Sequence, residues 1–271
     1  MRGWLWTMLW LIRDVNGRGK FQPIAYPQIT NQTFIKQCVD AHNKHRSEVK
    51  PTASNMLYMT WDLALARTAR AWGQRCIFLQ NYFLQHNGSG HPDPKFNPPG
   101  ENRWIANAGR RHFDPTRFIM SWYSEVAFYQ YHNNTCKSKC HHYTQVVWDT
   151  SHKIGCAIVF CYKLGRHRNV ENFVCNYAPR GNAPRLPYKT GKPCSACPEG
   201  DTCENNLCRN PQRDNIKRYT RWFPPWEGRI VCDKSCIAVA VLRPSLMFLA
   251  FGVAFYLHRH HPDLCLQNEC I

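Results

Sequence analysis

The sequence predicts an α+β fold in which helices cover a sheet. Three segments in the first half of the chain have helical periodicity, and two later runs are rich in Ile, Val, Phe, Tyr and Cys, as strands are. Helices followed by strands, without regular alternation, favour this class. The chain has 271 residues, of which 44% are hydrophobic, with 15 Gly and 18 Pro. It is therefore a globular protein with room for one large domain and accessory segments.

Residues 1–19 have the outline of a secretory signal peptide. Arg2 precedes an apolar stretch that reaches Ile12, and Gly17 and Gly19 supply the small residues that a signal peptidase reads. Arg13 interrupts the pattern early, so an ordinary apolar N-terminus is the alternative.

Apolar residues recur every three or four positions in three segments, which predicts three helices. The first spans residues 33–49, and the second spans residues 61–78 with Thr60 as its cap. The third starts at Asp114 and Pro115, since the carboxylate caps free N–H groups and proline fits the first turn. We expect the following residues of this third helix to point inward: Phe118, Ile119, Trp122, Val126 and Tyr129.

Two strands are expected at residues 154–162 and 170–178. Each run mixes β-branched and aromatic residues with cysteine, and the polar segment 164–168 between them resembles a turn. The two runs therefore predict a pair of neighbouring strands.

The segment 188–210 is short and rich in cysteine, with the pattern Cys194-x2-Cys197-x5-Cys203-x4-Cys208. It has too few apolar residues to form a core, so crosslinks must hold it. Disulfides are the first interpretation, and a zinc site built on the CxxC pair is the alternative.

The C-terminal part divides into three segments. Residues 211–236 are basic and aromatic, residues 237–257 form an apolar run with Arg243 inside it, and residues 258–271 are a polar tail. Twenty-one helical residues are roughly 30 Å long, enough to cross a bilayer. We expect a transmembrane helix at 237–257, with an amphipathic or buried C-terminal helix as the alternative.

Charge and cysteine content restrict the partners and the compartment. The 35 Lys and Arg outnumber the 18 Asp and Glu, a formal charge of +17 that favours acidic partners of any kind. The basic and aromatic residues cluster beside the expected membrane helix, where lipid headgroups explain them better than nucleic acid does. We expect Trp222, Phe223 and Trp226 at the membrane interface and no nucleic-acid partner. Fifteen cysteines indicate disulfides in an oxidising compartment, with at least one thiol left over.

Four strings occur in an order that is typical of one family. They are Pro99-Gly100-Glu101-Asn102, Ser121-Trp122-Tyr123-Ser124-Glu125, His142-Tyr143-Thr144-Gln145-Val146-Val147-Trp148, and Phe173-Val174-Cys175-Asn176-Tyr177-Ala178-Pro179-Arg180-Gly181-Asn182. Residues 32–187 therefore resemble the CAP superfamily of cysteine-rich secretory, antigen 5 and pathogenesis-related-1 proteins, and residues 188–210 resemble the hinge that follows in many members.

The resemblance implies an α-β-α sandwich with a three- or four-stranded antiparallel sheet and a shallow cleft. It also implies the disulfides Cys76–Cys161, Cys156–Cys175, Cys136–Cys140, Cys194–Cys203 and Cys197–Cys208. Five cysteines remain without a partner in this scheme: Cys38, Cys232, Cys236, Cys265 and Cys270.

In the family, two histidines and two glutamates converge in the cleft and can hold a divalent metal, commonly zinc. Glu101, Glu125 and His142 match three of these positions, and Gln80 occupies the fourth, where members have histidine. Glutamine offers no imidazole, so we expect weak zinc binding at most, unless His86 or His91 substitutes. A hydrogen-bonded network of Glu101, Glu125 and His142 is the structural alternative. Otherwise we expect no cofactor. His141 stands where members have glycine, and we expect it to be solvated.

The resemblance implies a non-catalytic binding protein of reproductive tissue or host defence, whose cleft takes a protein, lipid or sterol ligand. The alternative is a metal-dependent hydrolase in which His142 is the base and a glutamate orients it. Neither Ser121 nor Thr144 lies in a nucleophile motif, which counts against the hydrolase.

We expect a single-pass membrane protein with its N-terminal domain in the lumen or outside the cell, or else a secreted protein. Asn31, Asn87 and Asn133 begin glycosylation sequons, which are used only in the secretory pathway. Basic residues are more numerous before the apolar run than after it, which would favour the opposite orientation. The cysteines outweigh that signal, because a large domain is translocated largely regardless of charge.

Overall fold

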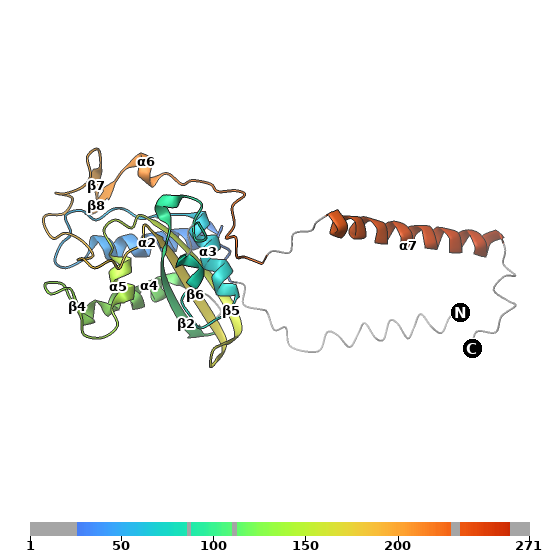
Figure 1. Cartoon of the computed structure of the whole chain (residues 1–271), viewed down its shortest axis with the longest axis horizontal. Helices are drawn as coiled ribbons and strands as arrows, with labels where there is room; N and C mark the ends of the chain where they lie inside the picture. The colour runs from blue at the N-terminus through green and yellow to red at the C-terminus, as the bar shows by residue number, and fades with distance from the viewer. Residues whose placement is uncertain (1–25, 86–87, 110–112, 229–233, 261–271) are drawn as a thin grey trace. The chain divides into compact units, whose positions relative to one another are not determined.

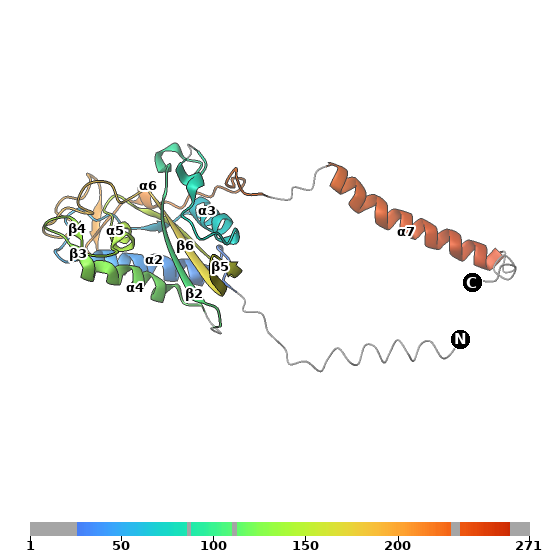
Figure 2. The ribbon, with the colours of Figure 1, turned by 60° about the horizontal axis from the view of Figure 1, so that its bottom comes forward.

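We describe residues 26–85, 88–109, 113–228 and 234–260 in a computed structural model of the chain. They belong to two compact units, one ending at Glu227 and the other beginning at Gly228. The first unit has a four-stranded sheet between helices, so the α+β prediction is confirmed (Figures 1 and 2). The expected signal at residues 1–19 and most of the expected polar tail lie outside the described residues.

The strands of the sheet lie in the order β1–β5–β6–β2. The central pair, β5 (Lys153–Leu164) and β6 (His167–Ala178), is the predicted hairpin, but both strands are longer than predicted. β2 (Gly100–Asn107) pairs antiparallel with β6, whereas β1 (Thr60–Trp61) pairs parallel with β5. Strands β5, β6 and β2 thus form the expected three-stranded antiparallel sheet, and the two-residue β1 adds a parallel edge that was not expected.

Helix α3 (Leu63–Gln74) covers one face of the sheet, and helices α2 (Gln32–Ser47) and α4 (Pro115–Ser124) cover the other (Figure 2). On the second face, the Phe173 ring of β6 is stacked with Trp122 of α4 at 5.4 Å and lies edge-on to Phe34 of α2 at 6.4 Å between ring centroids. Trp122, which was predicted to point inward from α4, thus meets the sheet, and Phe34 of α2 meets it as well.

The predicted second helix had the wrong bounds at both ends. Its cap is Asp62, whose carboxylate accepts the N–H groups of Ala64 at 2.8 Å and Leu65 at 3.1 Å. Thr60 instead belongs to β1, which is extended because it pairs with β5. The helix ends before Cys76, which has a φ of 51° and is disulfide-bonded to β5.

The third helix begins at Pro115 after its Asp114 cap, as predicted, but it ends at Ser124. A short 3-10 turn, η4 (Glu125–Phe128), follows and leads into β3 (Tyr129–Gln130), which pairs with β4 (Thr135–Cys136). The predicted helix therefore runs too far, because the chain leaves the helical path at Glu125.

Five disulfides connect the first unit, and their pairings are those implied by the resemblance. They are Cys76–Cys161, Cys136–Cys140, Cys156–Cys175, Cys194–Cys203 and Cys197–Cys208. Cys38 is a free thiol buried in the core. Cys232, Cys265 and Cys270 lie outside the described residues, and Cys236 is disulfide-bonded.

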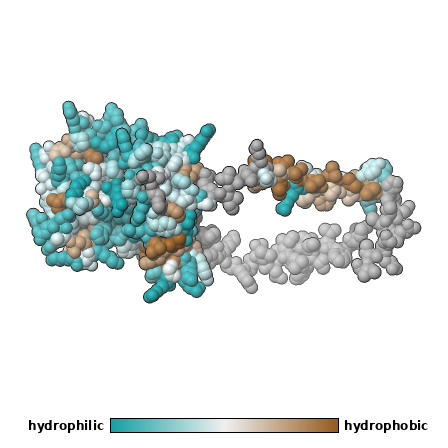
Figure 3. All heavy atoms as spheres, viewed as in Figure 1, coloured by the Kyte–Doolittle hydropathy of each residue, from teal (hydrophilic) through white to brown (hydrophobic). Residues whose placement is uncertain are grey.

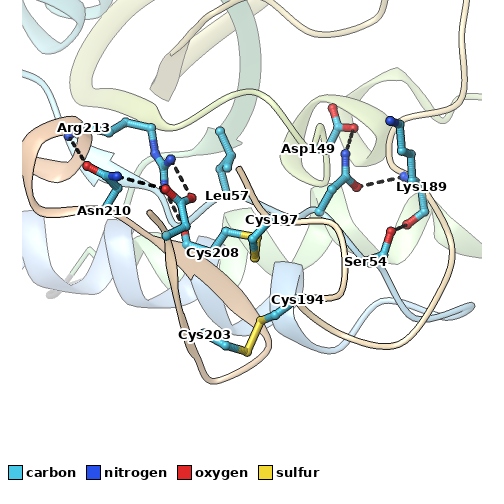
Figure 4. The surroundings of a disulfide bond; sticks show 12 residues. Ser54, Leu57, Asp149, Lys189, Cys194, Cys197, Cys203, Cys208, Asn210 and Arg213 are labelled. Atoms are coloured by element: carbon cyan, nitrogen blue, oxygen red, sulfur yellow. Dashed lines mark hydrogen bonds and ion pairs between the residues drawn. A yellow bond between two sulfur atoms is a disulfide. The ribbon is translucent and has the colours of Figure 1, made fainter. Parts of the chain in front are cut away.

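The cysteine-rich segment is fastened to the domain (Figure 4). It contains the small hairpin β7 (Thr202–Glu204) and β8 (Leu207–Arg209), followed by the short helix α6 (Pro211–Asp214). The Cys208 N–H donates to the Met56 carbonyl at 2.8 Å, and the Tyr58 N–H donates to the Cys208 carbonyl at 3.0 Å. The sulfur atoms of Cys194, Cys197 and Cys208 lie within 4.8 Å of one another, but each belongs to a disulfide, so the zinc alternative has no thiolates there.

Residues 215–227, which we call the strap, pack against helix α3 and the ring of Phe83. The guanidinium of Arg67 in α3 donates to the carbonyls of Tyr219 and Trp222, and Arg75 donates to the carbonyl of Trp226 at 2.7 Å. The Trp226 ring stacks on Phe83 at 4.8 Å.

Trp222, Phe223 and Trp226 are therefore half-buried against the domain. Their expected position at a membrane interface stays a prediction.

The second unit holds helix α7 (Lys234–His260), which contains the predicted span 237–257. Residues Ser235–His260 are long and apolar enough to cross a bilayer.

Replacing Gly155 with alanine should destabilise the domain by at least about 2 kcal/mol. A Cβ atom at this position of β5 would lie 2.1 Å from the Ala66 nitrogen of α3, so helix and strand would have to separate. Urea unfolding measures the change. Gly228→Ala is the matched control, because its Cβ would meet no atom within 4 Å. Equal stability of both variants would contradict the close packing of α3 on β5.

Candidate functional site

A cavity of about 680 Å³ lies beside β2 and contains three of the four positions singled out in the sequence. Gln80, Glu101 and His142 line it. A smaller cavity of about 140 Å³ shares Gln80 and Glu101 with it. The fourth residue, Glu125, does not line either cavity and instead lies behind His142.

Glu125 ends α4 and holds the start of α5 (His141–Val146). Its carboxylate accepts the N–H groups of His142 at 3.0 Å and Tyr143 at 3.3 Å, and Nδ1 of the His142 ring lies 2.6 Å from its Oε1. Burial alone would raise the pKa of Glu125, but the hydrogen bonds from His142 and the backbone outweigh it and lower that pKa below its ordinary value. Glu125 therefore serves as the cap that Cys140, the N-cap residue, does not provide with its own side chain.

This pairing determines how His142 presents its ring to the cavity. A carboxylate only accepts, so Nδ1 carries the proton that points to Glu125, and the other ring nitrogen, Nε2, is not engaged by Glu125. The His142 side chain is 32% exposed, against 13% for Glu125. The imidazole thus offers Nε2 to the cavity, in a fixed orientation.

Glu101 is the second polar group that lines the cavity. Its Oε1 accepts the Asn81 N–H at 3.2 Å, whereas its Oε2 is buried and has no hydrogen-bond partner among the described residues. Burial raises the pKa of Glu101 to about 7, which the Asn81 bond and Arg103 only partly offset. A Cβ at the preceding Gly100 would lie 2.1 Å from the Gln145 side-chain oxygen, so the Gln145 side chain would have to move.

A buried polar chain connects the cleft to the core. The Asn102 side chain donates to the His142 carbonyl at 3.0 Å and to the Tyr177 hydroxyl at 3.2 Å. That hydroxyl lies 2.9 Å from Nε2 of His42, whose Nδ1 lies 2.7 Å from the Cys38 carbonyl. Burial lowers the pKa of His42 to about 3, so it is neutral. Asn102 and Tyr177 thereby position the backbone of His142.

The expected network of Glu101, Glu125 and His142 is thus divided in two. One part joins Glu125 to His142, and the other joins Glu101 to the backbone of Asn81.

The donor set fits a tight zinc site poorly. Within the described residues, the hinge cysteines are the one group of three His, Cys, Asp or Glu ligand atoms that converge within 4.8 Å, so the cleft offers no such group. His142 and Glu101 supply at most two ligands, because the Glu125 oxygens are used by α5.

His91 does not replace the missing histidine. It is fully buried, with Nε2 3.3 Å from Asp62 and Nδ1 accepting the Asp93 N–H. His86 lies outside the described residues. The exposed Gln80 therefore remains at the fourth position, and His141 is exposed as expected.

The cleft lacks an activated hydroxyl group. Ser121 donates to the Arg117 carbonyl of its own helix, and the Thr144 hydroxyl lies among oxygens of Cys140, His141 and Asn182. Across the described part of the chain, no hydroxyl hydrogen-bonds His142.

Several cavity residues have no counterpart in the sequence reasoning. Arg103, Trp104 and Ile105 of β2 line the cavity together with Lys139 and His167. The sequence of β2 gave no signal for them, because apolar and polar residues do not alternate regularly from Gly100 to Asn107.

Replacing Glu101 with glutamine should stabilise the fold at pH 8 and change little below pH 4.5. The folded-state pKa of about 7 exceeds the ordinary 4.5, so the wild-type gains stability from its proton at low pH and loses it as the pH rises through 7. We expect a difference of about 1–3 kcal/mol at pH 8 by urea unfolding. Glu125→Gln is the control of opposite sign, since its carboxylate is stabilised by its partners. A loss of stability in Glu101→Gln at pH 8 would contradict the assignment.

Comparisons with known proteins agree with this fold. The model of the cysteine-rich secretory protein family CAP matches residues 39–177. GLIPR1-like protein 1 of Bos taurus is 41% identical over 88% of this chain and 95% of its own length, and glioma pathogenesis-related protein 1 of Mus musculus is 37% identical over 97% and 98%.

The crystal structure of Na-ASP-1 shares 26% identity at a TM-score of 0.53, covering 71% of this chain and 52% of the other. That of BmVAL-1 shares 26% at 0.54, covering 66% and 95%. With the sandwich, the five disulfides and the cleft in place, these matches show that the chain belongs to the CAP family of cysteine-rich secretory proteins.

Proposed function

We propose that the chain is a membrane-tethered binding protein whose CAP domain faces the lumen or the outside of the cell and whose cleft holds a ligand without turnover. The observation that carries the proposal is the cavity beside β2. Its polar groups, His142 and Glu101, are held in place and available, yet no nucleophile accompanies them. Such a cavity can recognise a ligand but has no group that would attack it.

The metal-dependent hydrolase is the less favoured alternative. It requires a metal or a nucleophile next to His142, and Gln80 occupies the position that would supply a second imidazole. A metal bound by His142 and Glu101 would act as a Lewis acid, but two protein ligands hold zinc weakly.

The lining favours a protein ligand over a lipid or sterol. Lys139, Arg103 and His167 place polar or charged groups around the apolar surface of Trp104 and Ile105. Sterols and acyl chains require a largely apolar enclosure, whereas a protein segment tolerates this mixture.

Zinc affinity should rise in Gln80→His, because a second imidazole would join His142 and Glu101 at the cavity. We expect an increase of at least about tenfold in calorimetric titration with zinc chloride. Gln74→His adds an imidazole to the exposed surface of α3 away from the cavity and should leave the affinity unchanged. Equal affinities in all three proteins would place the metal elsewhere.

The basic residues before α7 would favour a topology with the CAP domain in the cytosol, but they count less toward it than their number suggests. Lys217, Arg218 and Arg221 belong to the strap and therefore to the folded first unit. Arg209 and Arg213, which precede the strap, form ion pairs with acidic side chains such as Asp214. Charges inside a folded domain count less toward orientation than those in short flanking loops.

Glycosylation tests the placement of the domain. Asn31 and Asn133 are exposed, whereas Asn87 lies outside the described residues. We expect glycosidase digestion of protein from secretory cells to lower its apparent mass, and Asn133→Gln to remove part of that shift. Carbonate extraction should leave the protein in membranes. An unglycosylated, soluble cytosolic chain would refute the proposal, and release into the medium would favour the secreted alternative.

A further inference from the structure

Strand β2 is an edge strand with a free side. Its one neighbour in the sheet is β6 (Figure 1). The Ala108 N–H donates to the Asn169 carbonyl at 2.8 Å, and the register places Asn107 opposite Val170. In an antiparallel ladder the residues that exchange hydrogen bonds alternate, so the backbone groups of 101, 103, 105 and 107 point away from β6. Within the described residues, nothing hydrogen-bonds these outward groups.

The larger cavity runs along this free side. It is lined by Arg103 and Ile105, which face α3, and also by Trp104 and Ala106, which face α4. Successive side chains of a strand point to opposite faces, so a cavity that touches both sets must follow the edge of the strand. Figure 3 shows an apolar area on the otherwise hydrophilic domain, in the region where β2, β5 and β6 lie in Figure 1.

The segment that follows Cys76 is joined to β2 through the Arg103 side chain. Arg103 donates to the carbonyls of Ile77 and Leu79, each at 2.8 Å, and its guanidinium lies 5.6 Å from the centre of the exposed Phe78 ring. The disulfide of Cys76 with Cys161 fixes the start of the same segment. These contacts use side-chain donors and leave the β2 backbone groups unpaired.

The charges around the groove favour an acidic occupant. Lys139 and His142 lie at the Glu101 side and His167 lies toward Asn107, whereas Glu101 is the one acidic residue of the lining. A second copy of this chain is disfavoured as the occupant, because pairing of β2 with itself would bring Arg103, Lys139 and a net charge of +17 against the same charges.

We propose that the free edge of β2 binds an extended acidic segment of a partner protein as a fifth strand of the sheet. The segment would hydrogen-bond with the outward backbone groups, and its acidic side chains would meet Lys139 and His167. Eight residues of β2 span roughly 27 Å and accommodate a segment of similar length. This inference rests on the proposed function and names the ligand of its cleft.

Ile105→Pro tests the backbone part of the inference. The full chain in detergent micelles is titrated against a fluorescein-labelled eight-residue peptide in which aspartate alternates with valine, and anisotropy reports binding. Proline removes an outward N–H without breaking the ladder to β6, so we expect at least tenfold weaker binding. Ile105→Ala keeps the N–H and should weaken binding no more than threefold. Both substitutions remove the Ile105 side chain that packs against Leu164 and Val170, so the unfolding temperature of Ile105→Pro should be close to that of Ile105→Ala.

The peptide supplies a second, independent control, because it does not alter the protein. In an added strand, alternate N–H groups face β2, so N-methylation of one alternate set should abolish binding and methylation of the other set should not. Equal loss with both sets, no loss with either, or no binding of the parent peptide would overturn the inference.

The charge part is tested with Lys139→Gln and with a peptide in which lysine replaces aspartate. We expect the variant to bind the acidic peptide several-fold more weakly, and the lysine peptide to show no binding. Equal binding of the two peptides would overturn the acidic assignment. Dimers in sedimentation equilibrium that Ile105→Pro abolishes would identify a second copy as the occupant and overturn it too.

Mass spectrometry of the peptide after incubation separates this inference from the proposed function. Cleavage of a bound peptide would refute a cleft without turnover and leave strand addition standing. An intact peptide that never binds, with the glycosylated membrane topology observed, would refute strand addition alone.

Discussion

The guanidinium of Arg46 joins the parts of the domain on which the cleft depends. The side chain is 1% exposed and makes six hydrogen bonds to carbonyl oxygens, of Leu57, Val146, Trp148, Asp149 and Ser151. Burial lowers its pKa to about 9, and it stays charged at neutral pH. A buried charge would be costly without such partners, so α2 and the chain between α5 and β5 must keep their positions together. Helix α5, which carries His142, is therefore held in place as well, because its Val146 carbonyl is one of these partners.

A second buried link acts on the same helix from the sheet side. His42 lies one helical turn before Arg46 and reaches His142 through the Tyr177 hydroxyl and the Asn102 amide. Glu125 completes the arrangement from α4. Since core polar groups fix α5 from three directions, the orientation of the His142 ring is a property of the whole sandwich and not of a surface loop.

Sequence reasoning recovered the elements whose signals are local. Helix α2, the Asp114 start of α4 and the β5–β6 hairpin follow from periodicity and capping, and the family resemblance supplied the disulfides. Sequence reasoning missed β1, because a strand of two residues shows no hydrophobic periodicity. It also missed that Arg46 is buried, although Cys38, His42 and Arg46 are spaced four residues apart and therefore lie on one face of the helix. In the cleft it identified Glu101, Glu125 and His142 but could not foresee that Glu125 serves α5, since that bond depends on where α4 ends.

The two edges of the sheet differ in a way that bears on binding. β1 is two residues long and pairs only with the start of β5, so it presents little free backbone. β2 is eight residues long, and its outward groups are unpaired within the described chain. Natural proteins usually shorten, cover or bend such an edge, because it invites pairing with other chains. Here the Arg103 side chain donates to the carbonyls of Ile77 and Leu79, and the backbone edge of β2 stays accessible beside the cleft. A long free edge carries a risk of aggregation, because other chains can pair with it. The positively charged lining of the groove limits that risk, since it repels further copies of this chain and attracts an acidic strand.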